Sequence, residues 1–496
     1  MQRRDRLSPV LSDDQLLTWR EELRAAAYTL DEVWERLGAA ALAGLGRNSS
    51  LPTLRALGDA EDDQADAIRF WLLGVPLPAE RVRALHTEVD ALLSSGLVIA
   101  EGDDLRAVVE LKPYGDETGS FWICADRTPL DGRVPPPRPD FVLGASPAST
   151  TLAQLIPRTP VGSALDLGTG CGIQALHLAG HCDRVIGTDL NPRALELARI
   201  TAALSGVEVE FRLGSLYEPV AEQRFDLIVT NPPYVMTPPN RSGLVYREGT
   251  EAGDGLMRRV VAEAAERLNP GGTLIVLGNW AITDEPWSDR VAGWIPPGCD
   301  ALVLQREQLD PFEYVELWLA DAGLAGTDDY QQRYREWLDY FDDLGITSIG
   351  MGWIAVRAAG RERPEIRCEE WPHLVHQPVG AAFDAFFAAV DQARLPDDEF
   401  VSSCWTLHPD VIQETIADPG AADPQHLILR QQFGFGRAVE PGTALAAVVG
   451  ACDGELPLSV LIDAVASLTG TEGTQLRAEL LPLLRRLVSE GFLTQS

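Results

Sequence analysis

The sequence predicts an α/β protein in which a central parallel sheet stands between two mainly helical terminal modules. Across residues 148–360, short β-branched runs alternate with amphipathic segments, a pattern typical of a parallel sheet with crossover helices. Residues 1–110 and 361–496 instead space their apolar side chains at helical intervals. A chain of 496 residues has room for about two to four domains.

Both terminal modules are expected to be winged-helix-like. In residues 1–110, helices are followed by a short hairpin, and the first helix is expected to begin at Ser12 or Asp13, which are suitable N-caps. Residues 361–496 contain three apolar helical segments that suggest a second small bundle. Residues 111–147 are predicted to form short strands and a proline-rich connector, because proline cannot continue a helix.

The composition excludes several classes of protein. Hydrophobic residues make up 45% of the chain, too many for a disordered or fibrous protein. No apolar run approaches the roughly 18–20 residues of a membrane helix, and the basic start of the chain lacks the apolar stretch of a secretory signal. We therefore expect a soluble cytoplasmic protein with no membrane partner.

The net charge and the cysteine content further limit the partners and metals that we expect the protein to bind. The formal net charge is −33 and no third of the chain has a basic excess, which disfavours nucleic acid as a partner. The seven cysteines include no C-x-x-C pair, as in a reduced cytoplasmic protein. His373 and His376 lie near Cys368, but no second ligand cluster completes a zinc pattern, so no metal is predicted.

A glycine-rich loop within residues 163–179 is the first segment that carries chemistry. The run SALDLGTGCGIQALHLA predicts a buried strand, a tight turn over Gly168–Gly172 and a helix whose first N–H groups are unpaired. The next strand ends at Asp189, 21 residues beyond Gly168, where a carboxylate can accept both hydroxyls of a ribose. The loop lacks the GK[ST] of a phosphate-binding loop and differs from the G-x-G-x-x-G of a dinucleotide site.

The run RFDLIVTNPPYV, residues 224–235, is the second such segment. It predicts a strand with Asn231, Pro232, Pro233 and Tyr234 at its carboxyl end, where open α/β sheets bind ligands. The Asn231 side-chain oxygen and the Pro232 carbonyl can each accept one N–H of an –NH₂ group, while Tyr234 can lie flat on a planar acceptor. Holding both N–H bonds aims the nitrogen lone pair, so Asn231, Pro232 and Tyr234 are candidate catalytic residues, and Pro233 and Tyr234 are candidate substrate contacts.

Together the two segments resemble the class I S-adenosylmethionine-dependent methyltransferases with an NPPY motif, the bacterial HemK/PrmC-like and RsmC-like "methyltransferase small" group. The resemblance covers about residues 140–280. It implies a seven-stranded Rossmann-like sheet and S-adenosylmethionine as the cofactor, with Asp166 near its amino group and Asp189 on its ribose. The residues that it implies for the cofactor site are Asp166, Gly168, Thr169, Gly170, Gly172, Asp189, Ser215, Leu216 and Asn231.

Two positions depart from the pattern of this family. Ser215 stands where an acid usually contacts the adenine amino group, so recognition of adenine there would depend on a hydroxyl. The fifth predicted strand ends in LGNW, residues 277–280, where glutamine methyltransferases usually have an acidic ending. The second departure weakens the case for a release factor as the methyl acceptor.

Two segments around the motif are candidates for contact with the acceptor. In the polar loop 235–253, Arg241, Tyr246 and Arg247 are the candidates for contact with the substrate; the alternative is that they are solvent-exposed loop residues. A helical insertion at about 311–344 is rich in aromatic residues. We favour the interpretation that these aromatics are core residues packed against the terminal modules; the alternative is an aromatic wall over the acceptor pocket.

The sequence therefore predicts an S-adenosylmethionine-dependent N-methyltransferase that acts on a planar amide or exocyclic amino nitrogen held by residues 231–234. A protein or small-molecule acceptor is favoured because the chain is acidic. A base of ribosomal RNA, transfer RNA or DNA is the alternative acceptor, and a catalytically degenerate cofactor-binding scaffold is the alternative of another class. Each enzyme hypothesis requires residues 231–234 to lie beside the glycine turn in the folded chain.

Overall fold

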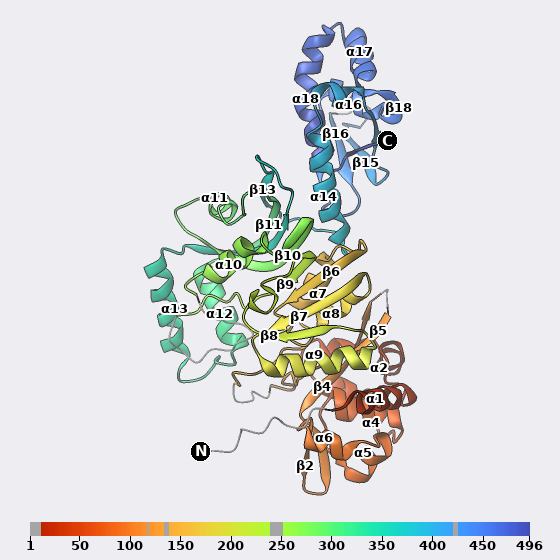
Figure 1. The fold of residues 1–496 in the computed structure, drawn as a ribbon, viewed down its shortest axis with the longest axis vertical. Helices are drawn as coiled ribbons and strands as arrows, with labels where there is room; N and C mark the ends of the chain where they lie inside the picture. The colour runs from red at the N-terminus through yellow and green to blue at the C-terminus, as the bar shows by residue number, and fades with distance from the viewer. Residues whose placement is uncertain (1–10, 117–118, 133–137, 239–250, 420–424) are drawn as a thin grey trace.

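The computed structural model describes residues 11–116, 119–132, 138–238, 251–419 and 425–496. Figure 1 shows an elongated molecule with the central sheet in the middle, the N-terminal region at the lower end and the C-terminal region at the upper end. Among the described residues, no helix combines the length and apolar character required to cross a membrane.

In the described part of the chain, the central sheet has eight strands in the order β13-β11-β12-β10-β9-β6-β7-β8. Strands β6 to β10 are parallel where they pair, whereas β12 runs antiparallel to β10 and β11. The predicted α/β class with a mostly parallel central sheet is confirmed. The strand bounds are β6 (Val161–Leu167), β7 (Cys182–Asp189), β8 (Glu210–Leu213), β9 (Phe225–Thr230), β10 (Leu268–Ile282), β11 (Asp300–Leu309), β12 (Ser348–Arg357) and β13 (Ile366–Glu370).

The prediction of seven strands is wrong by one. The eighth strand, β13, pairs in parallel with β11 from Ala301 opposite Ile366 to Gln305 opposite Glu370. Without β13, the outer backbone groups of β11 would form an open sheet edge. The sheet therefore takes in a segment beyond residue 361, which the sequence pattern assigns to the C-terminal module.

Helices cover both faces of the sheet. On one face, apolar side chains of α10 and α11 share a buried core with alternate residues of β6, β9, β10 and β12. On the other face, α7, α8 and α14 form a second core with the intervening residues of the same strands. The bounds of these helices are α7 (Pro147–Leu155), α8 (Ile173–Ala179), α10 (Gly255–Ala264), α11 (Trp287–Ala292) and α14 (Gly380–Ala393).

The N-terminal region packs on the sheet domain through one continuous core. This core contains residues from α1 to β5 together with Ile173 and Leu176 of α8 and Leu197 of α9 (Pro192–Ser205). Helix α1 begins as expected, with Ser12 as its N-cap and a hydrogen bond to the Ser12 hydroxyl from the backbone of Gln15. The elements of the region are α1 (Asp13–Ala25), α2 (Leu30–Leu45), α3 (Leu51–Leu57), α4 (Asp63–Ala67), a π-helix (Ile68–Leu72), β1 (Leu77–Pro78), α5 (Ala79–Leu85), α6 (Val89–Ser94), β2 (Val98–Glu101), β3 (Asp104–Ala107), β4 (Val109–Asp116) and β5 (Gly119–Asp126).

The C-terminal region follows α14, which leads from the sheet to the upper end of the molecule (Figure 1). The prediction that this region is mainly helical is incomplete, because its described residues form two three-stranded sheets, β18-β14-β19 and β15-β16-β17. These strands are short and half-exposed, so they leave little periodic signal beside the apolar helices. The elements are α15 (Asp397–Ser402), β14 (Cys404–Leu407), β15 (Val411–Ile416), β16 (His426–Gln431), β17 (Ala438–Val439), α16 (Thr443–Gly450), β18 (Asp453–Pro457), α17 (Leu458–Thr469), α18 (Gly473–Ser489) and β19 (Leu493–Gln495).

Candidate functional site

The carboxyl ends of β6, β7, β8 and β9 meet at one edge of the central sheet. Leu167, the last residue of β6, lies opposite Thr188 on one side and Thr230 on the other. Asp189 at the end of β7 lies opposite Leu213 of β8. Neighbouring strands are about 4.8 Å apart, so the glycine loop after Leu167 and the NPPY segment after Thr230 begin side by side. The required juxtaposition of the two segments is therefore present.

The glycine loop turns through three left-handed residues, Gly168, Gly170 and Gly172, with φ of 75°, 53° and 86°. A Cβ at Gly172 would lie 3.2 Å from the Cβ of Ala198, so this glycine allows α8 to approach α9. A Cβ at Gly168 or Gly170 would meet no atom of the described residues within 4 Å. The loop therefore packs tightly on its helix side and faces open space at its first two glycines.

Asp189 is anchored to the loop by backbone N–H groups. Its Oδ2 accepts a hydrogen bond from the backbone of Gly170 at 2.9 Å, and its Oδ1 accepts one from Asn191 at 2.8 Å. Burial raises the pKa of Asp189 above its ordinary value, although these hydrogen bonds favour the carboxylate. The side chain is thus held at the tip of β7 with carboxylate lone pairs still available.

Asp166 lies beneath the loop and is 1% exposed. Its Oδ2 accepts a hydrogen bond from the Thr169 hydroxyl at 2.6 Å and another from the backbone of Ala175 at 3.0 Å. Burial raises its pKa to about 7, and the nearby Asp189 acts in the same direction, while the two hydrogen bonds oppose the change. Asp166 therefore links the loop to α8, and its pKa of about 7 means that it loses or gains its proton near neutral pH.

The NPPY segment presents an unsatisfied acceptor at the end of β9. The Oδ1 atom of Asn231 is buried and has no hydrogen-bond partner among the described residues. Pro232 is buried, and Asn231, Pro233 and Tyr234 are half-buried. Burial raises the pKa of Tyr234 to about 12, so its phenol stays protonated at neutral pH. A buried amide oxygen without a partner is costly unless a ligand supplies the missing donor.

The helical insertion packs against this segment. It consists of α12 (Pro311–Asp321) and α13 (Tyr330–Leu344). The buried hydroxyl of Tyr314 accepts hydrogen bonds from the backbone of Met236 at 3.1 Å and from Nδ2 of Asn279 at 2.8 Å. The ring of Trp318 meets that of Tyr234 edge-on, with centroids 6.2 Å apart.

The insertion's aromatics are core residues, as expected, but the expectation that they pack against the terminal modules is wrong. They form a core with Val235, Met236, Ala281 and Ile349, at the edge of the sheet that carries the candidate site, and this core contains no described residue of either terminal module. Tyr314 and Asn279 are therefore residues near the site that sequence reasoning missed. The aromatic richness of the insertion was visible, but nothing in the sequence shows that its partners lie just after the NPPY motif.

Two known protein families match separate parts of the chain, and one of them covers the candidate site. The family described as "Methyltransferase small domain" matches residues 145–288, and one described as "Domain of unknown function (DUF7059)" matches residues 25–108. The chain is 37% identical over 218 residues to "Release factor glutamine methyltransferase" of Geobacter sulfurreducens, which covers 42% of this chain and 74% of that protein. A protein of the same description from Deinococcus radiodurans is 33% identical, over 42% of this chain and 81% of its own length.

The chain belongs to the class I S-adenosylmethionine-dependent methyltransferases of the HemK-like and RsmC-like group. It is accordingly an S-adenosylmethionine-dependent N-methyltransferase. "Ribosomal RNA small subunit methyltransferase C" of Alcanivorax borkumensis is a more distant relative, 29% identical over 26% of this chain and 35% of that protein. The relatives therefore include proteins named for a protein acceptor and for an RNA acceptor.

The edge of the sheet that carries the glycine loop and the NPPY segment fits the cofactor of this methyltransferase family. The open space beside Gly168 and Gly170 leaves room for a ligand against the loop backbone. The two carboxylates, Asp166 and Asp189, match a ligand that carries an ammonium group and a pair of hydroxyls, because both are hydrogen-bond donors. In the described parts of the chain, no cluster of three or more His, Cys, Asp or Glu side chains could hold a metal ion.

The remaining predicted residues lie in two places. Ser215 and Leu216 form the turn after β8, where Leu216 adopts a left-handed φ of 45° and the backbone of Glu218 donates a hydrogen bond to the Ser215 carbonyl. The turn follows the strand next to Asp189, so it adjoins the candidate site. Arg241, Tyr246 and Arg247 lie outside the described residues.

Proposed function

We propose that this methyltransferase transfers a methyl group to the nitrogen of a side-chain amide in a protein, with Asn231 holding that nitrogen. The observation that carries the proposal is the buried, unpartnered Oδ1 atom of Asn231 beside the glycine loop. An –NH₂ group of the acceptor would supply the missing donor. A primary amide fits, because its two N–H bonds can be shared between this oxygen and the Pro232 carbonyl.

The NPPY residues act by orientation. An amide nitrogen is a poor nucleophile because its lone pair is delocalised into the carbonyl group. Asn231 and Pro232 accept the two N–H bonds and so turn the lone pair toward the methyl donor. These hydrogen bonds strengthen as positive charge develops on the nitrogen, and the proton becomes acidic only after transfer, so no strong general base is required. Pro233 and Tyr234 contact the planar acceptor.

The loop and the two carboxylates hold the cofactor. S-adenosylmethionine supplies an electrophilic methyl group on a sulfonium. Gly168, Thr169, Gly170 and Gly172 would place backbone against it, and Asp189 would accept hydrogen bonds from its ribose hydroxyls. Asp166 lies near its amino group in this proposal, and its charge would be the complement of an ammonium ion. Ser215, Leu216 and Asn231 complete the proposed cofactor contacts.

A protein acceptor is supported by two observations. The relatives from Geobacter sulfurreducens and Deinococcus radiodurans, at 37% and 33% identity, are both named for a glutamine residue of a protein. The formal charge of −33 also disfavours a long polyanionic substrate. An RNA base amine is the second candidate, which the name of the Alcanivorax relative favours.

Radiolabelled S-adenosylmethionine offered to cell extract separated into protein, RNA and small molecules tests the proposal. We expect label in the protein fraction. The variant Asn231→Ala should lose transfer and retain most of its cofactor binding, because eight of the nine proposed cofactor contacts remain. Asn269→Ala, at the amino-terminal end of β10 on the opposite side of the sheet, should keep both. Label in the RNA fraction alone would overturn the protein acceptor, and full activity of Asn231→Ala would overturn the role of Asn231.

A further inference from the structure

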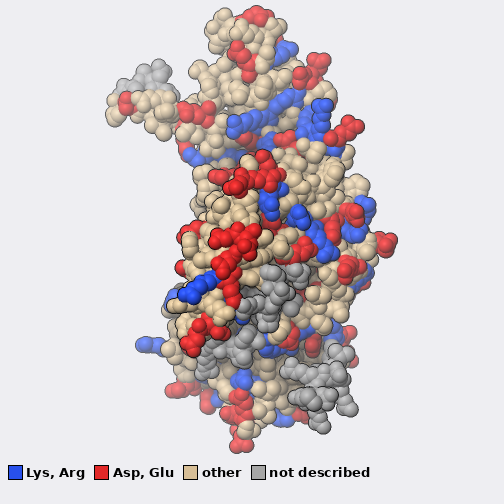
Figure 2. Space-filling model, turned by 90° about the vertical axis from the view of Figure 1, so that its left-hand side faces the viewer, with Lys and Arg blue, Asp and Glu red and all other residues tan. Residues whose placement is uncertain are grey.

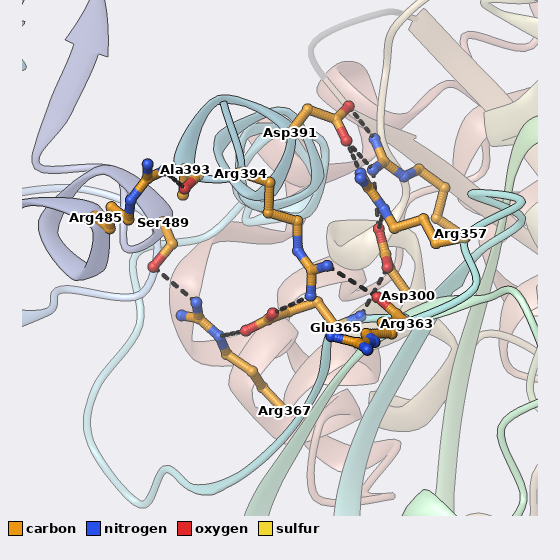
Figure 3. A network of polar contacts seen from close by, with 11 residues as sticks. Asp300, Arg357, Arg363, Glu365, Arg367, Asp391, Ala393, Arg394, Arg485 and Ser489 are labelled. Atoms are coloured by element: carbon orange, nitrogen blue, oxygen red, sulfur yellow. Dashed lines mark hydrogen bonds and ion pairs between the residues drawn. The ribbon is translucent and has the colours of Figure 1, made fainter. Parts of the chain in front are cut away.

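A pocket of about 260 Å³ lies between β13, α14 and α18, away from the candidate site at the carboxyl ends of β6 to β9. Four arginines line it: Arg367 on β13, Arg394 just after α14, and Arg485 and Arg486 on α18. Figure 3 shows Arg367 and Arg394 meeting at Glu365, with Arg485 to one side beside Ala393. We call this the arginine pocket.

The charge of the pocket is opposite to that of the chain. Residues 361–496 contain nine arginines, and four of them line this one pocket. Glu365 is the one carboxylate among the described lining residues. In Figure 2, blue side chains gather in the upper half of one face, on a surface where red side chains are spread from top to bottom. This concentration is not explained by the average composition of the region.

A neighbouring cluster shows what a purely structural ion-pair joint looks like. Arg357 and Arg361 contact Asp300 and Asp391, so two guanidinium groups meet two carboxylates and the charges cancel. Figure 3 shows Arg357, Asp300 and Asp391 of this cluster next to Arg394 and Glu365 of the arginine pocket. In the pocket, by contrast, Arg367 and Arg394 share the carboxylate of Glu365. Arg485 pairs with Asp397 and Arg486 with Glu490, so four guanidinium groups meet three carboxylates. The pocket therefore has an excess of positive charge that the adjoining joint lacks.

Protein contacts fix the guanidinium groups and leave donors free. Arg367 donates from Nε to Glu365 at 2.9 Å and from Nη2 to Ser489 at 2.7 Å, and its Nη1 makes no bond within the described chain. Arg486 donates from Nε to Glu490 at 2.8 Å, and its two terminal nitrogens make no hydrogen bond within the described chain. Arg394 and Arg485 use their terminal nitrogens on protein acceptors and contribute fixed charge.

Aromatic rings hold two of these side chains in place. The guanidinium of Arg367 lies 5.3 Å from the ring centroid of Phe386, and that of Arg485 lies 4.4 Å from that of Phe400. Planar guanidinium groups fixed in this way lose little conformational entropy when they bind an oxyanion. The guanidinium groups of Arg367 and Arg485 are thus preorganised beside the cavity, whereas Arg486 is held by its bond to Glu490 alone and is more exposed.

We propose that the arginine pocket binds a compact oxyanion with two negative charges, of the phosphate monoester class. Arginine forks match the geometry and charge of a phosphate group. A volume of about 260 Å³ is close to the lower limit of small-molecule pockets, so it suits one phosphate with a small organic group. A nucleic-acid backbone would require a longer basic stripe. The bound anion would link β13, α14 and α18, and this role is independent of the methyl acceptor.

Thermal unfolding of the full chain in inorganic phosphate, with ionic strength held constant by sodium chloride, tests the pocket. We expect a saturable rise in Tm that chloride does not produce, and a parallel titration with ribose 5-phosphate distinguishes a phosphorylated metabolite from the free ion. Arg486→Gln, an exposed substitution, and the double variant Arg367→Gln/Arg486→Gln should bind at least about tenfold more weakly, since each loses charge-assisted hydrogen bonds. Arg430→Gln, a surface arginine paired with Glu414, is the matched control.

Hydrogen exchange locates the effect. Phosphate should slow exchange in β13, the end of α14 and α18, and this protection should disappear in the double variant while Arg430→Gln retains it. An equal Tm response in all variants, or no saturable response, would overturn the proposal. Tighter binding of single-stranded RNA than of either small phosphate would also overturn it, in favour of a nucleic-acid surface.

Discussion

The hydroxyl of Thr230 donates a hydrogen bond to the carbonyl oxygen of Leu167 at 2.7 Å. Thr230 is the last residue before the NPPY segment, and Leu167 is the last residue before the glycine loop. A single buried side-chain bond thus connects the two segments at the point where both leave the sheet. Methyl transfer depends on the spacing of donor and acceptor to within fractions of an ångström, so this bond lies where spacing matters most.

Substituting Thr230→Val tests this connection. Valine keeps the shape of threonine but leaves the Leu167 carbonyl without its partner, so we expect the free energy of unfolding to fall by about 1–2 kcal/mol. We also expect a lower rate of methyl transfer with cofactor affinity nearly unchanged. Urea unfolding and single-turnover kinetics measure the two effects. Thr347→Val, which removes an exposed hydroxyl bonded to the Ile282 carbonyl, is the control, and equal behaviour of the two variants would count against the connection.

Tyr314→Phe tests the support that the insertion gives to the site. The substitution leaves two buried donors, the backbone N–H of Met236 and the Nδ2 of Asn279, without their common acceptor. We expect a loss of about 2–3 kcal/mol in stability, since each unsatisfied buried donor costs about 1 kcal/mol or more.

Transfer activity should fall in Tyr314→Phe while calorimetric binding of S-adenosylmethionine persists, because Tyr314 contacts the NPPY side and not the glycine loop. Tyr334→Phe, which removes an exposed hydroxyl bonded to Glu316, should change neither property. If Tyr314→Phe lost cofactor affinity as strongly as activity, the insertion would support the whole sheet edge rather than the acceptor side.

Local patterns could predict the two motifs but not what surrounds them. The glycines at 168, 170 and 172 and the two prolines after Asn231 identify a strand end by themselves, since few other structures tolerate them there. The partners of Tyr314 are 78 and 35 residues away in the sequence, and several aromatics of the insertion looked equally suitable. Strand β13 has the half-exposed run IRCEE, whose pairing with β11 depends on an open edge that only the folded sheet provides.

Alanine substitutions at Gly168 and Gly172 distinguish a glycine that is needed for packing from one that is needed for cofactor binding. Both Gly168 and Gly172 are left-handed, so each substitution costs about 1–2 kcal/mol in backbone conformation. At Gly172 the new Cβ would also crowd Ala198, so Gly172→Ala should lose more stability. At Gly168 the Cβ would enter open space where we propose the cofactor, so Gly168→Ala should lose more affinity for S-adenosylmethionine. Urea unfolding measures the loss of stability in each variant, and calorimetry measures the loss of affinity for S-adenosylmethionine. If one variant lost more of both, the proposed position of the cofactor would be contradicted.

The charge of Asp166 should make stability depend on pH. Burial raises its pKa to about 7, above the value of about 3.9 in an unfolded chain. The folded protein therefore holds the proton more tightly, and the stabilisation from this group is complete below about pH 4 and lost as the pH rises through about 7. Asp166→Asn stays neutral throughout. Wild type should thus lose free energy of unfolding relative to the variant between about pH 4 and 7, and parallel profiles would contradict the raised pKa.

Cofactor affinity should show the opposite dependence. If the ionised Asp166 faces the ammonium group of S-adenosylmethionine, binding requires the proton to leave, so affinity should rise with pH until it levels above about 7. Calorimetry near pH 6 in two buffers of different ionisation enthalpy should reveal release of about one proton per cofactor bound. Asp166→Asn should bind more weakly at high pH and show no such release. Proton release that persists in this variant would assign it to another group and remove Asp166 from the proposed cofactor contacts.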